Sequence, residues 1–392
     1  MARLPFRVFP IAFLTAIFYL NFVSRVILGP FLPVVESELG LGHAEAGSLF
    51  FFIQIGYATG LLGSGLLSWR FTHRRTIVIS SLGVGIAMLG LSRSGSLNEI
   101  RFWLALLGGA AGLYLPSGIA TITHLVDEAH WGKALAVHEL APSLGFTTAP
   151  LLAEWLYGSI SWRGVFSVLG FVAVFLSGCF AFAGRGGALR GEPPRLESIA
   201  RIMRNPSMWV MGCLFAVGIG PGIGLYGMTP LFLVSGVGLS WETANTITGL
   251  SRIPGLFVIF FAGWLTDRIG DRRTLMLVLA STGLLTIALG LFLGPSLTPL
   301  FIFLQAAAGV LFFPPAFVAT SRLVPPHMRN LAISLATGMG IVVGGGGAPW
   351  LIGYLAEVAT FSTAFALIGI VTLSSPLLLR ASMRSESKAT SL

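Results

Sequence analysis

Long apolar runs alternate with short polar stretches along the whole chain of 392 residues. An apolar run of about 20 residues is long enough to cross a bilayer as an α-helix. The pattern predicts an all-α membrane protein with one six-helix bundle at 1–183, a cytoplasmic linker at 184–206, a second six-helix bundle at 207–380 and a cytoplasmic tail at 381–392. The twelve predicted transmembrane helices are 8–34, 44–68, 76–93, 100–123, 133–157, 162–183, 207–235, 242–266, 274–294, 298–321, 331–356 and 361–380.

Two basic loops reveal an internal repeat. The stretch 67–76 reads LSWRFTHRRT and the stretch 265–274 reads LTDRIGDRRT, so the second follows the first by 265 − 67 = 198 residues. The same offset relates Leu115-Pro116 to Phe313-Pro314 inside two later apolar runs. The two bundles are therefore predicted to be pseudo-symmetric copies, with a substrate site near the membrane midplane.

Composition agrees with a protein that lies in a bilayer. Hydrophobic residues make up 55% of the chain and charged residues 10%, against about 25% charged in soluble domains. The net charge of +9 gathers in the N-terminus, the even-numbered loops and the C-terminus. That asymmetry predicts cytoplasmic termini and a multi-pass protein of the cytoplasmic (inner) membrane. The distribution of basic residues therefore indicates the orientation of the chain in the membrane. We expect a monomer surrounded by lipid, with no nucleic-acid partner.

Two arginines lie deep inside apolar runs. Arg25 is 11 residues from Glu36, and Arg252 is 11 residues from Trp241, which places both roughly 16 Å from the outer end of their helices. A mid-membrane arginine costs at least about 2.5 to 3.5 kcal/mol. No carboxylate occurs at that depth in any predicted span. A guanidinium group without an acidic neighbour suits a substrate carboxylate or phosphate, although a purely structural role is the alternative.

Polar and aromatic residues accompany both arginines at helical spacing. Asn21 is four residues from Arg25, and Asn245, Thr248 and Arg252 follow each other three and four residues apart, which aligns them on one helix face. Aromatic side chains are expected as walls for an apolar part of the substrate, or as ordinary packing. The candidate substrate-binding residues are Arg25, Arg252, Asn21, Tyr19, Gln54, Tyr57, Tyr114, Tyr226, Asn245 and Thr248.

Proton coupling has two candidates near the predicted inner mouth, His138 and Glu139, because both can titrate. Hydrogen bonding in the loop region is the plainer interpretation of each, and electroneutral exchange of two anions would need no protein acid. The chain has no cluster of His, Asp or Cys inside the apolar runs that could form a catalytic centre or a metal site. We therefore expect no enzyme activity, no metal and no cofactor.

The basic loops resemble the short loop after the second helix of each half in the major facilitator superfamily, whose form is roughly Gly-x-x-x-Asp-Arg-x-Gly-Arg-Arg. The resemblance implies a gating loop, with the acid helping to hold one face of the carrier closed. The second copy fits well, whereas the first has Trp69 and Thr72 where the family has the acid and the second glycine. The residues that carry the motif are Gly65, Arg70, Arg74, Arg75, Gly263, Asp267, Arg268, Gly270, Arg272 and Arg273.

The stretch from Tyr19 to Tyr57 is also similar to the organic-anion branch of that superfamily, in which Asn-x-x-x-Arg lies near an anionic substrate. Arg252 in the eighth span is similar to monocarboxylate and nitrate carriers. Ser24 stands where the branch commonly has an aspartate, which puts its usual proton coupling in doubt.

These features predict a secondary active transporter that moves a small organic anion, a carboxylate, by alternating access. Its partners would be the anion and either protons or a counter-anion. A proton-driven multidrug exporter is the alternative, although the Gly-Pro-x-x-Gly-Gly pattern of drug exporters is absent from Ala149 to Ala153. A non-transporting membrane receptor is a further alternative. The sequence does not identify the substrate, the direction of transport, the coupling ion or the conformational state.

Overall fold

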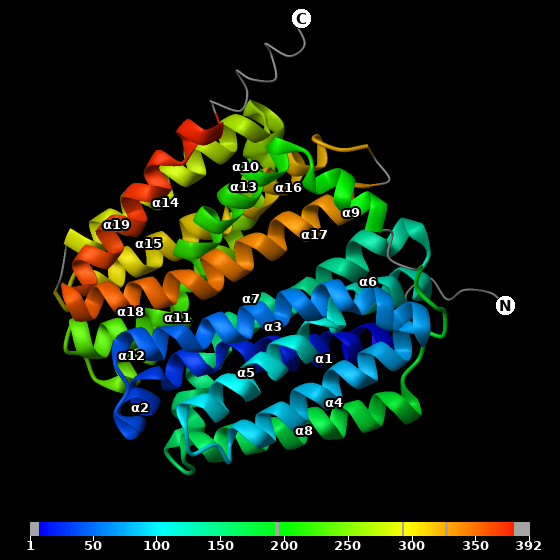
Figure 1. Ribbon diagram of the computed structural model, residues 1–392, viewed down its shortest axis with the longest axis horizontal. Coiled ribbons are helices and arrows are strands. Elements are labelled where there is room, and N and C mark those ends of the chain that lie inside the picture. Colours follow the sequence, from blue (N-terminus) through cyan, green and yellow to red (C-terminus); the bar gives the residue numbers. More distant parts are fainter. Residues whose placement is uncertain (1–7, 193–195, 292–293, 326–327, 380–392) are drawn as a thin grey trace, which may run out of the picture. The chain divides into compact units, whose positions relative to one another are not determined.

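The computed structural model describes residues 8–192, 196–291, 294–325 and 328–379 (Figure 1). Every regular element in these ranges is a helix. Ten continuous helical stretches are long and apolar enough to cross a bilayer, and several of them consist of two or more of the elements named below. A bent pair, Trp241–Ile259 with Phe261–Ile269, makes an eleventh. The predicted span 133–157 is the helix Trp131–Tyr157, which has 27 residues and is not among these eleven. The helical membrane architecture predicted from the sequence is therefore confirmed.

Contacts divide the chain into two compact units. The first unit contains the described residues of 1–39 and 52–194, and the second contains those of 40–51 and 195–392. The boundary runs through α3, whose first turns belong to the second unit. The helices that lie in the first unit, with the part of α3 after residue 51, are α1 (Val8–Val26), α2 (Leu28–Leu39), α3 (His43–Arg70), α4 (His73–Leu91), α5 (Leu97–Gly112), α6 (Tyr114–Leu125), the short η1 (Glu128–His130), α7 (Trp131–Tyr157) and α8 (Trp162–Ala183).

The second unit repeats this order of long and broken helices. Its elements are α9 (Leu196–Met203), α10 (Pro206–Ile219), η2 (Gly220–Gly224), α11 (Leu225–Leu231), η3 (Phe232–Gly236), α12 (Trp241–Leu250), α13 (Ile253–Ile269), α14 (Asp271–Leu291), α15 (Thr298–Val310), α16 (Phe313–Ser321), α17 (Arg329–Gly340), η5 (Ile341–Gly347), α18 (Ala348–Val358) and α19 (Phe361–Ser374). In the first unit α4 packs along α8, and in the second α14 packs along α19, as Figure 1 shows. The start of α14 follows the start of α4 by 271 − 73 = 198 residues, which is the offset of the sequence repeat.

Prolines determine where four of the spans break. A proline has no amide hydrogen, so it cannot donate to the carbonyl four residues earlier, and the helix tends to end there. The helices α1, α5, α12 and α15 end at Val26, Gly112, Leu250 and Val310. Each of these residues is four positions before a proline of the next helix. The prolines are Pro30, Pro116, Pro254 and Pro314.

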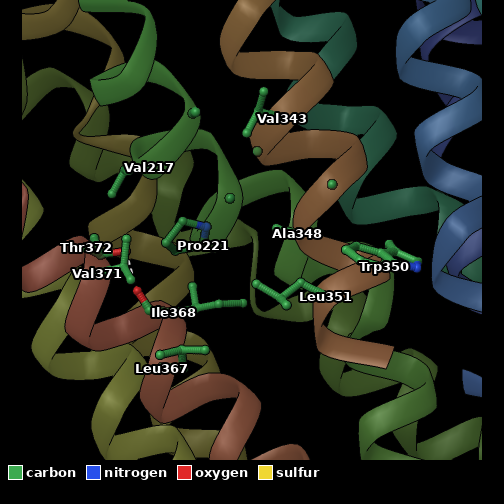
Figure 2. Close-up of a pocket in the computed structure, with 14 residues that line it drawn as sticks. Val217, Pro221, Val343, Ala348, Trp350, Leu351, Leu367, Ile368, Val371 and Thr372 are labelled. Carbon is green, nitrogen blue, oxygen red and sulfur yellow. Dashed lines mark hydrogen bonds between the residues drawn. The ribbon is translucent and has the colours of Figure 1, made fainter. Parts of the chain in front are cut away.

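Wide π-helical turns replace such breaks in the seventh and eleventh spans, at η2 and η5. A Cβ atom added to Gly344 would collide with the backbone of Ala216 and Gly220, so only glycine allows this approach. Beside the two turns lies an apolar cavity of about 400 Å³, shown in Figure 2 with Pro221, Leu351 and Ile368 on its walls. Its lining contains no charged side chain, so it is not a site for an anion.

The predicted linker 184–206 begins as part of the first unit. The amides of His73 and Arg74 at the start of α4 donate to the carbonyls of Leu189 and Gly187 over 3.0 and 2.7 Å. Gly187 adopts a φ of 69°, which favours glycine at this tight turn. Later in the linker, residues Leu196 to Met203 form the helix α9. The boundaries of the predicted bundles and tail stay predictions.

Candidate anion-binding site

Arg25 is buried in the first unit against aromatic rings. Its side chain is 8% exposed, and its guanidinium carbon lies 4.0 Å from the ring centre of Tyr57 and 4.9 Å from that of Phe22. The Nε atom has no hydrogen-bond partner. Among the described residues of this unit, no carboxylate forms an ion pair with Arg25. A desolvated cation over an aromatic face gains about 2 kcal/mol, but it leaves the charge itself unneutralised.

Arg252 has a similar aromatic neighbour in the second unit. Its guanidinium carbon lies 4.6 Å from the ring centre of Tyr226, and its Nη1 donates to the carbonyl of Gly222 over 3.4 Å. Gly222 belongs to the wide turn η2, whose backbone hydrogen bonds differ from those of a regular α-helix. Arg252 therefore joins the eighth span to the unwound part of the seventh.

Both arginines lie where a membrane helix ends inside its span. Arg25 is in the last turn of α1, and Arg252 follows the end of α12 at Leu250 by two residues. The C-terminus of a helix carries a partial negative charge, which favours a nearby cation. Arg252 also stands directly before α13, whose N-terminus carries a partial positive charge of the opposite effect, so the stabilisation by a helix end applies to Arg25.

The arginine and tyrosine exchange places between the two repeats. In the first unit the arginine is on the first span and Tyr57 on the second, whereas in the second unit Tyr226 is on the first span and Arg252 on the second. Gln54 is the repeat equivalent of Arg252, because 252 − 54 = 198. An arginine–tyrosine contact therefore occurs in both units, formed by positions that are not equivalent in the repeat.

Buried amide groups near the arginines lack partners. Asn245 is fully buried, and neither its amide nitrogen nor its oxygen forms a hydrogen bond. The side-chain oxygens of Gln54 and Asn21 are also buried without a partner. Buried polar atoms are nearly always paired in proteins, with protein groups, water or a ligand. These three amides are therefore candidate contacts for a bound polar molecule.

Several predicted site residues also form hydrogen bonds within their own unit. Asn21 donates to the carbonyl of Ala111 over 3.2 Å, which lies at the break between α5 and α6. Tyr19 shares a hydrogen bond of 2.7 Å with Thr148 on α7. Thr248 donates to the carbonyl of Ala244 on its own helix. Their contact with a substrate stays a prediction.

Tyr114 belongs to a hydrogen-bonded chain and not to an open wall. It is fully buried, and its hydroxyl lies 2.7 Å from the carbonyl oxygen of Leu14 and 3.1 Å from Nε2 of His138. His138 is also fully buried, stacked 4.4 Å from the ring of Phe18. Its Nδ1 lies 3.2 Å from Oε1 of Glu139, a side chain that is 53% exposed.

The donors and acceptors in this chain of contacts follow from the hydroxyl of Tyr114. A carbonyl oxygen only accepts, so the single hydroxyl hydrogen of Tyr114 is donated to Leu14, and Nε2 of His138 must then carry a hydrogen to donate to the hydroxyl oxygen. Nδ1 of a neutral imidazole would in that case point its lone pair at the carboxylate of Glu139. In that arrangement Nδ1 of His138 and Oε1 of Glu139 are both acceptors, 3.2 Å apart. The predicted role of the pair in proton coupling stays a prediction.

Gln305 is a buried polar residue that the sequence reasoning did not select. Its amide nitrogen donates to the carbonyl of Pro221 over 2.7 Å and lies 3.5 Å from the hydroxyl of Thr286. Gln305 and Arg252 thus bind two carbonyls of the same wide turn, at Pro221 and Gly222. The available signal was the presence of one amide in the apolar run 299–310.

Replacement of Gln305 by leucine is expected to lower the melting temperature of the purified protein. The buried carbonyl of Pro221 would lose the amide donor of Gln305, a loss that costs about 1 to 3 kcal/mol. The measurement is thermal unfolding in detergent. Thr286→Val is the matched control, because it removes only the longer contact and should shift the melting temperature much less. An equal shift in both variants would contradict the role given to Gln305.

The two basic loops have the same local hydrogen bonds. Thr76 donates to the carbonyl of Thr72, and its equivalent Thr274 donates to the carbonyl of Gly270, both over 2.9 Å. Gly270 has a φ of 89°, a conformation that favours glycine at the turn. Arg70 and Arg268 stack on the neighbouring aromatic rings of Phe71 and Trp264.

The acid that forms an ion pair in the second loop is Asp271, which the motif does not include. Asp271 is 3% exposed, and its Oδ1 lies 2.7 Å from Nη1 of Arg322, just after α16. Asp267, the acid of the motif, is exposed. The gating role of Asp267 stays a prediction, and Asp271 is a second acid by which this loop is attached to the tenth span.

Comparison with known families agrees with this architecture. The model of the Major Facilitator Superfamily matches residues 13–302 and 244–391. The chain belongs to the major facilitator superfamily. It is a multi-pass membrane protein of a transporter family, as the repeated loops predicted.

The chain is also similar to individual transporters and to solved structures. It is 25% identical over 289 residues to a probable nitrate/nitrite transporter, NarK2, of Mycobacterium tuberculosis, covering 71% of each chain. It is 24% identical over 392 residues to the cis,cis-muconate transport protein of Acinetobacter baylyi, covering 94% of this chain and 92% of that one. A crystal structure of a bacterial homologue of the human lysosomal transporter Spinster superposes with a TM-score of 0.77 at 16% identity, over 96% of this chain and 95% of that one, which supports the fold alone.

Proposed function

We propose that this member of the superfamily is a secondary transporter of a small organic anion, a carboxylate, across the cytoplasmic membrane by alternating access. The observation that carries the proposal is the guanidinium of Arg25. It is buried near the middle of a membrane span, it lies on two aromatic rings, and no carboxylate among the described residues of its unit forms an ion pair with it. A substrate carboxylate would supply the missing negative charge through two parallel hydrogen bonds.

Arg252, Tyr226 and Asn245 support the same proposal from the second unit. The tyrosine faces let an unsaturated or aromatic acid lie beside each guanidinium. The unpaired amide of Asn245 offers both a donor and an acceptor to a polar substituent. Relatives named as carriers of muconate and of nitrate have anionic substrates. The apolar surface of the tyrosines favours the organic acid over a small inorganic anion.

We further propose that the anion moves together with a proton bound between His138 and Glu139. Phe18, which stacks on His138, and Arg25 are seven residues apart on α1 and therefore share a helix face roughly 10 Å apart. A proton added at His138, which stacks on a residue of the same helix as Arg25, is repelled by the positive charge of Arg25. An anion at Arg25 offsets this repulsion, so anion and proton would bind more tightly together than separately.

A panel of anions tests the function directly. Purified protein is heated with cis,cis-muconate, benzoate, succinate, nitrate or phosphate, since a ligand that binds the folded state raises the melting temperature. We expect the largest shift with an unsaturated or aromatic carboxylate, and saturable exchange of that anion in proteoliposomes. Binding without movement across the bilayer would favour a receptor, and transport of cationic dyes in place of anions would favour the exporter.

A further inference from the structure

A basic groove lies at the start of α4 in the first unit. It has a volume of about 680 Å³. The arginines and larger apolar residues that line it are Phe71, Arg74, Arg75, Val78, Ile79 and Arg190. Three of these six side chains are guanidinium groups, and no carboxylate lines the groove. We call it the N groove.

The second unit has a groove of about 480 Å³ at the equivalent place, the start of α14. Its walls include Ile269, Arg273, Met276, Leu277, Leu373 and Leu377. Four of them are repeat equivalents of N-groove residues at the offset of 198, because Phe71, Arg75, Val78 and Ile79 correspond to Ile269, Arg273, Met276 and Leu277. We call it the C groove. The same cavity has thus formed in both halves of the repeat.

Each groove is charged at one end and apolar at the other. Arg75 and Arg273 are the third residues of their helices, and the apolar residues follow three and four positions later, roughly 5 to 6 Å deeper in the membrane. Ile79 is 39% exposed and Leu277 is 55% exposed. A molecule with an anionic head and an apolar chain would match this order of surfaces.

The guanidinium groups, and not the helix amides, are available to a ligand in the N groove. The amides of His73 and Arg74 are bound by the linker carbonyls, and the amide of Arg75 is bound by the hydroxyl of Thr72. Arg74 donates from Nη2 to the carbonyl of Ala181 over 2.9 Å, which holds its side chain against the end of α8. Arg75 and Arg190 are exposed.

We propose that each groove binds an anionic phospholipid, with the phosphate on Arg75 or Arg273 and an acyl chain on the apolar residues below. Basic pockets between membrane helices recognise anionic headgroups in this way. A zwitterionic lipid would bring its ammonium group against arginines, in grooves whose described linings contain no carboxylate. Free phosphate would leave the apolar half of the groove uncovered. The N groove, with three arginines against one, is the tighter of the two.

Native mass spectrometry of the full-length protein tests the proposal with phosphatidylglycerol and phosphatidylcholine as probes. The wild-type protein is expected to retain two molecules of phosphatidylglycerol and to bind phosphatidylcholine more weakly. The double variant Arg75→Gln and Arg190→Gln should lose the tighter molecule, and Arg273→Gln the weaker one. A loss of about fivefold in affinity per arginine is expected, which corresponds to about 1 kcal/mol each.

Arg93→Gln is the matched control, because Arg93 is exposed at the opposite end of α4 and the substitution removes the same charge. Its lipid binding should equal that of the wild type, and Arg75→Lys should retain most of the binding. Unchanged melting temperatures will show that the variants fold. Equal retention in all variants, equal binding of phosphatidylcholine, or displacement of the lipid by millimolar inorganic phosphate would each overturn the proposal.

Discussion

Replacement of Arg25 by glutamine is expected to weaken binding of the transported anion by about 30-fold or more. Removal of one partner of a desolvated charge pair costs about 2 to 5 kcal/mol, and each 1.4 kcal/mol is a factor of ten. The measurement is the dissociation constant of the carboxylate that gives the largest thermal shift, together with its exchange in proteoliposomes. Arg252→Gln should have an effect of the same sign, through the second arginine–tyrosine pair.

Two further variants make this result specific. Arg25→Lys keeps the charge but loses the planar fork and much of its stacking on Tyr57, so it should recover only part of the affinity. Arg93→Gln removes an exposed arginine far from the site along the chain and should bind the anion as the wild type does. If Arg25→Gln and Arg93→Gln bound the anion equally well, Arg25 would not be part of the site.

Replacement of His138 by phenylalanine is expected to abolish accumulation of the anion driven by a pH gradient, while exchange of anion across the membrane continues. The phenyl ring can stack on Phe18 but cannot hold the proposed proton beside Glu139. The measurements are uptake with and without an inward proton gradient, and proton influx followed with a pH-sensitive dye inside the liposomes.

Glu139→Gln offers an independent check on the proton. The amide of glutamine can donate to Nδ1 of His138 without an added proton, so the variant should mimic the protonated pair and transport the anion independently of pH. Proton influx at the wild-type rate in both variants would show that the coupling site lies elsewhere. Loss of exchange as well as accumulation would instead point to a structural role, which the melting temperature would reveal.

The sequence predicted the architecture well because the bilayer imposes a simple rule on it. Every backbone amide and carbonyl must be satisfied within the membrane, so an apolar run of about 20 residues has few alternatives to a helix. The breaks could also be read from the chain, since α12 ends four residues before Pro254 and α15 ends four residues before Pro314. The π-helical turns could not be predicted from the sequence, because glycine-rich stretches are compatible with both regular and widened helices.

The candidate site was predicted in part. The depth of Arg25 and Arg252 follows from counting residues along a helix, and the contact of Arg25 with Tyr57 follows a grouping that the polar pattern suggested. The partners of Tyr114 could not be predicted from the sequence, because its bonds to Leu14 and His138 join residues that are 100 and 24 positions apart. Spacing along one helix contains no information about which neighbouring helix a side chain meets.

By itself, the sequence determined that this is a repeated helical carrier with two arginines in the membrane. Hydrophobic length, the positions of prolines and the repeat offset are all properties of the chain taken one segment at a time. Only the tertiary structure decided which polar groups are paired. It assigned the amide of Gln305 to the wide turn at Pro221, paired Asp271 with Arg322, and placed His138 between Tyr114 and Glu139. The physical reason is that a hydrogen bond extends only about 3 Å, so its partner is determined by the packing of helices.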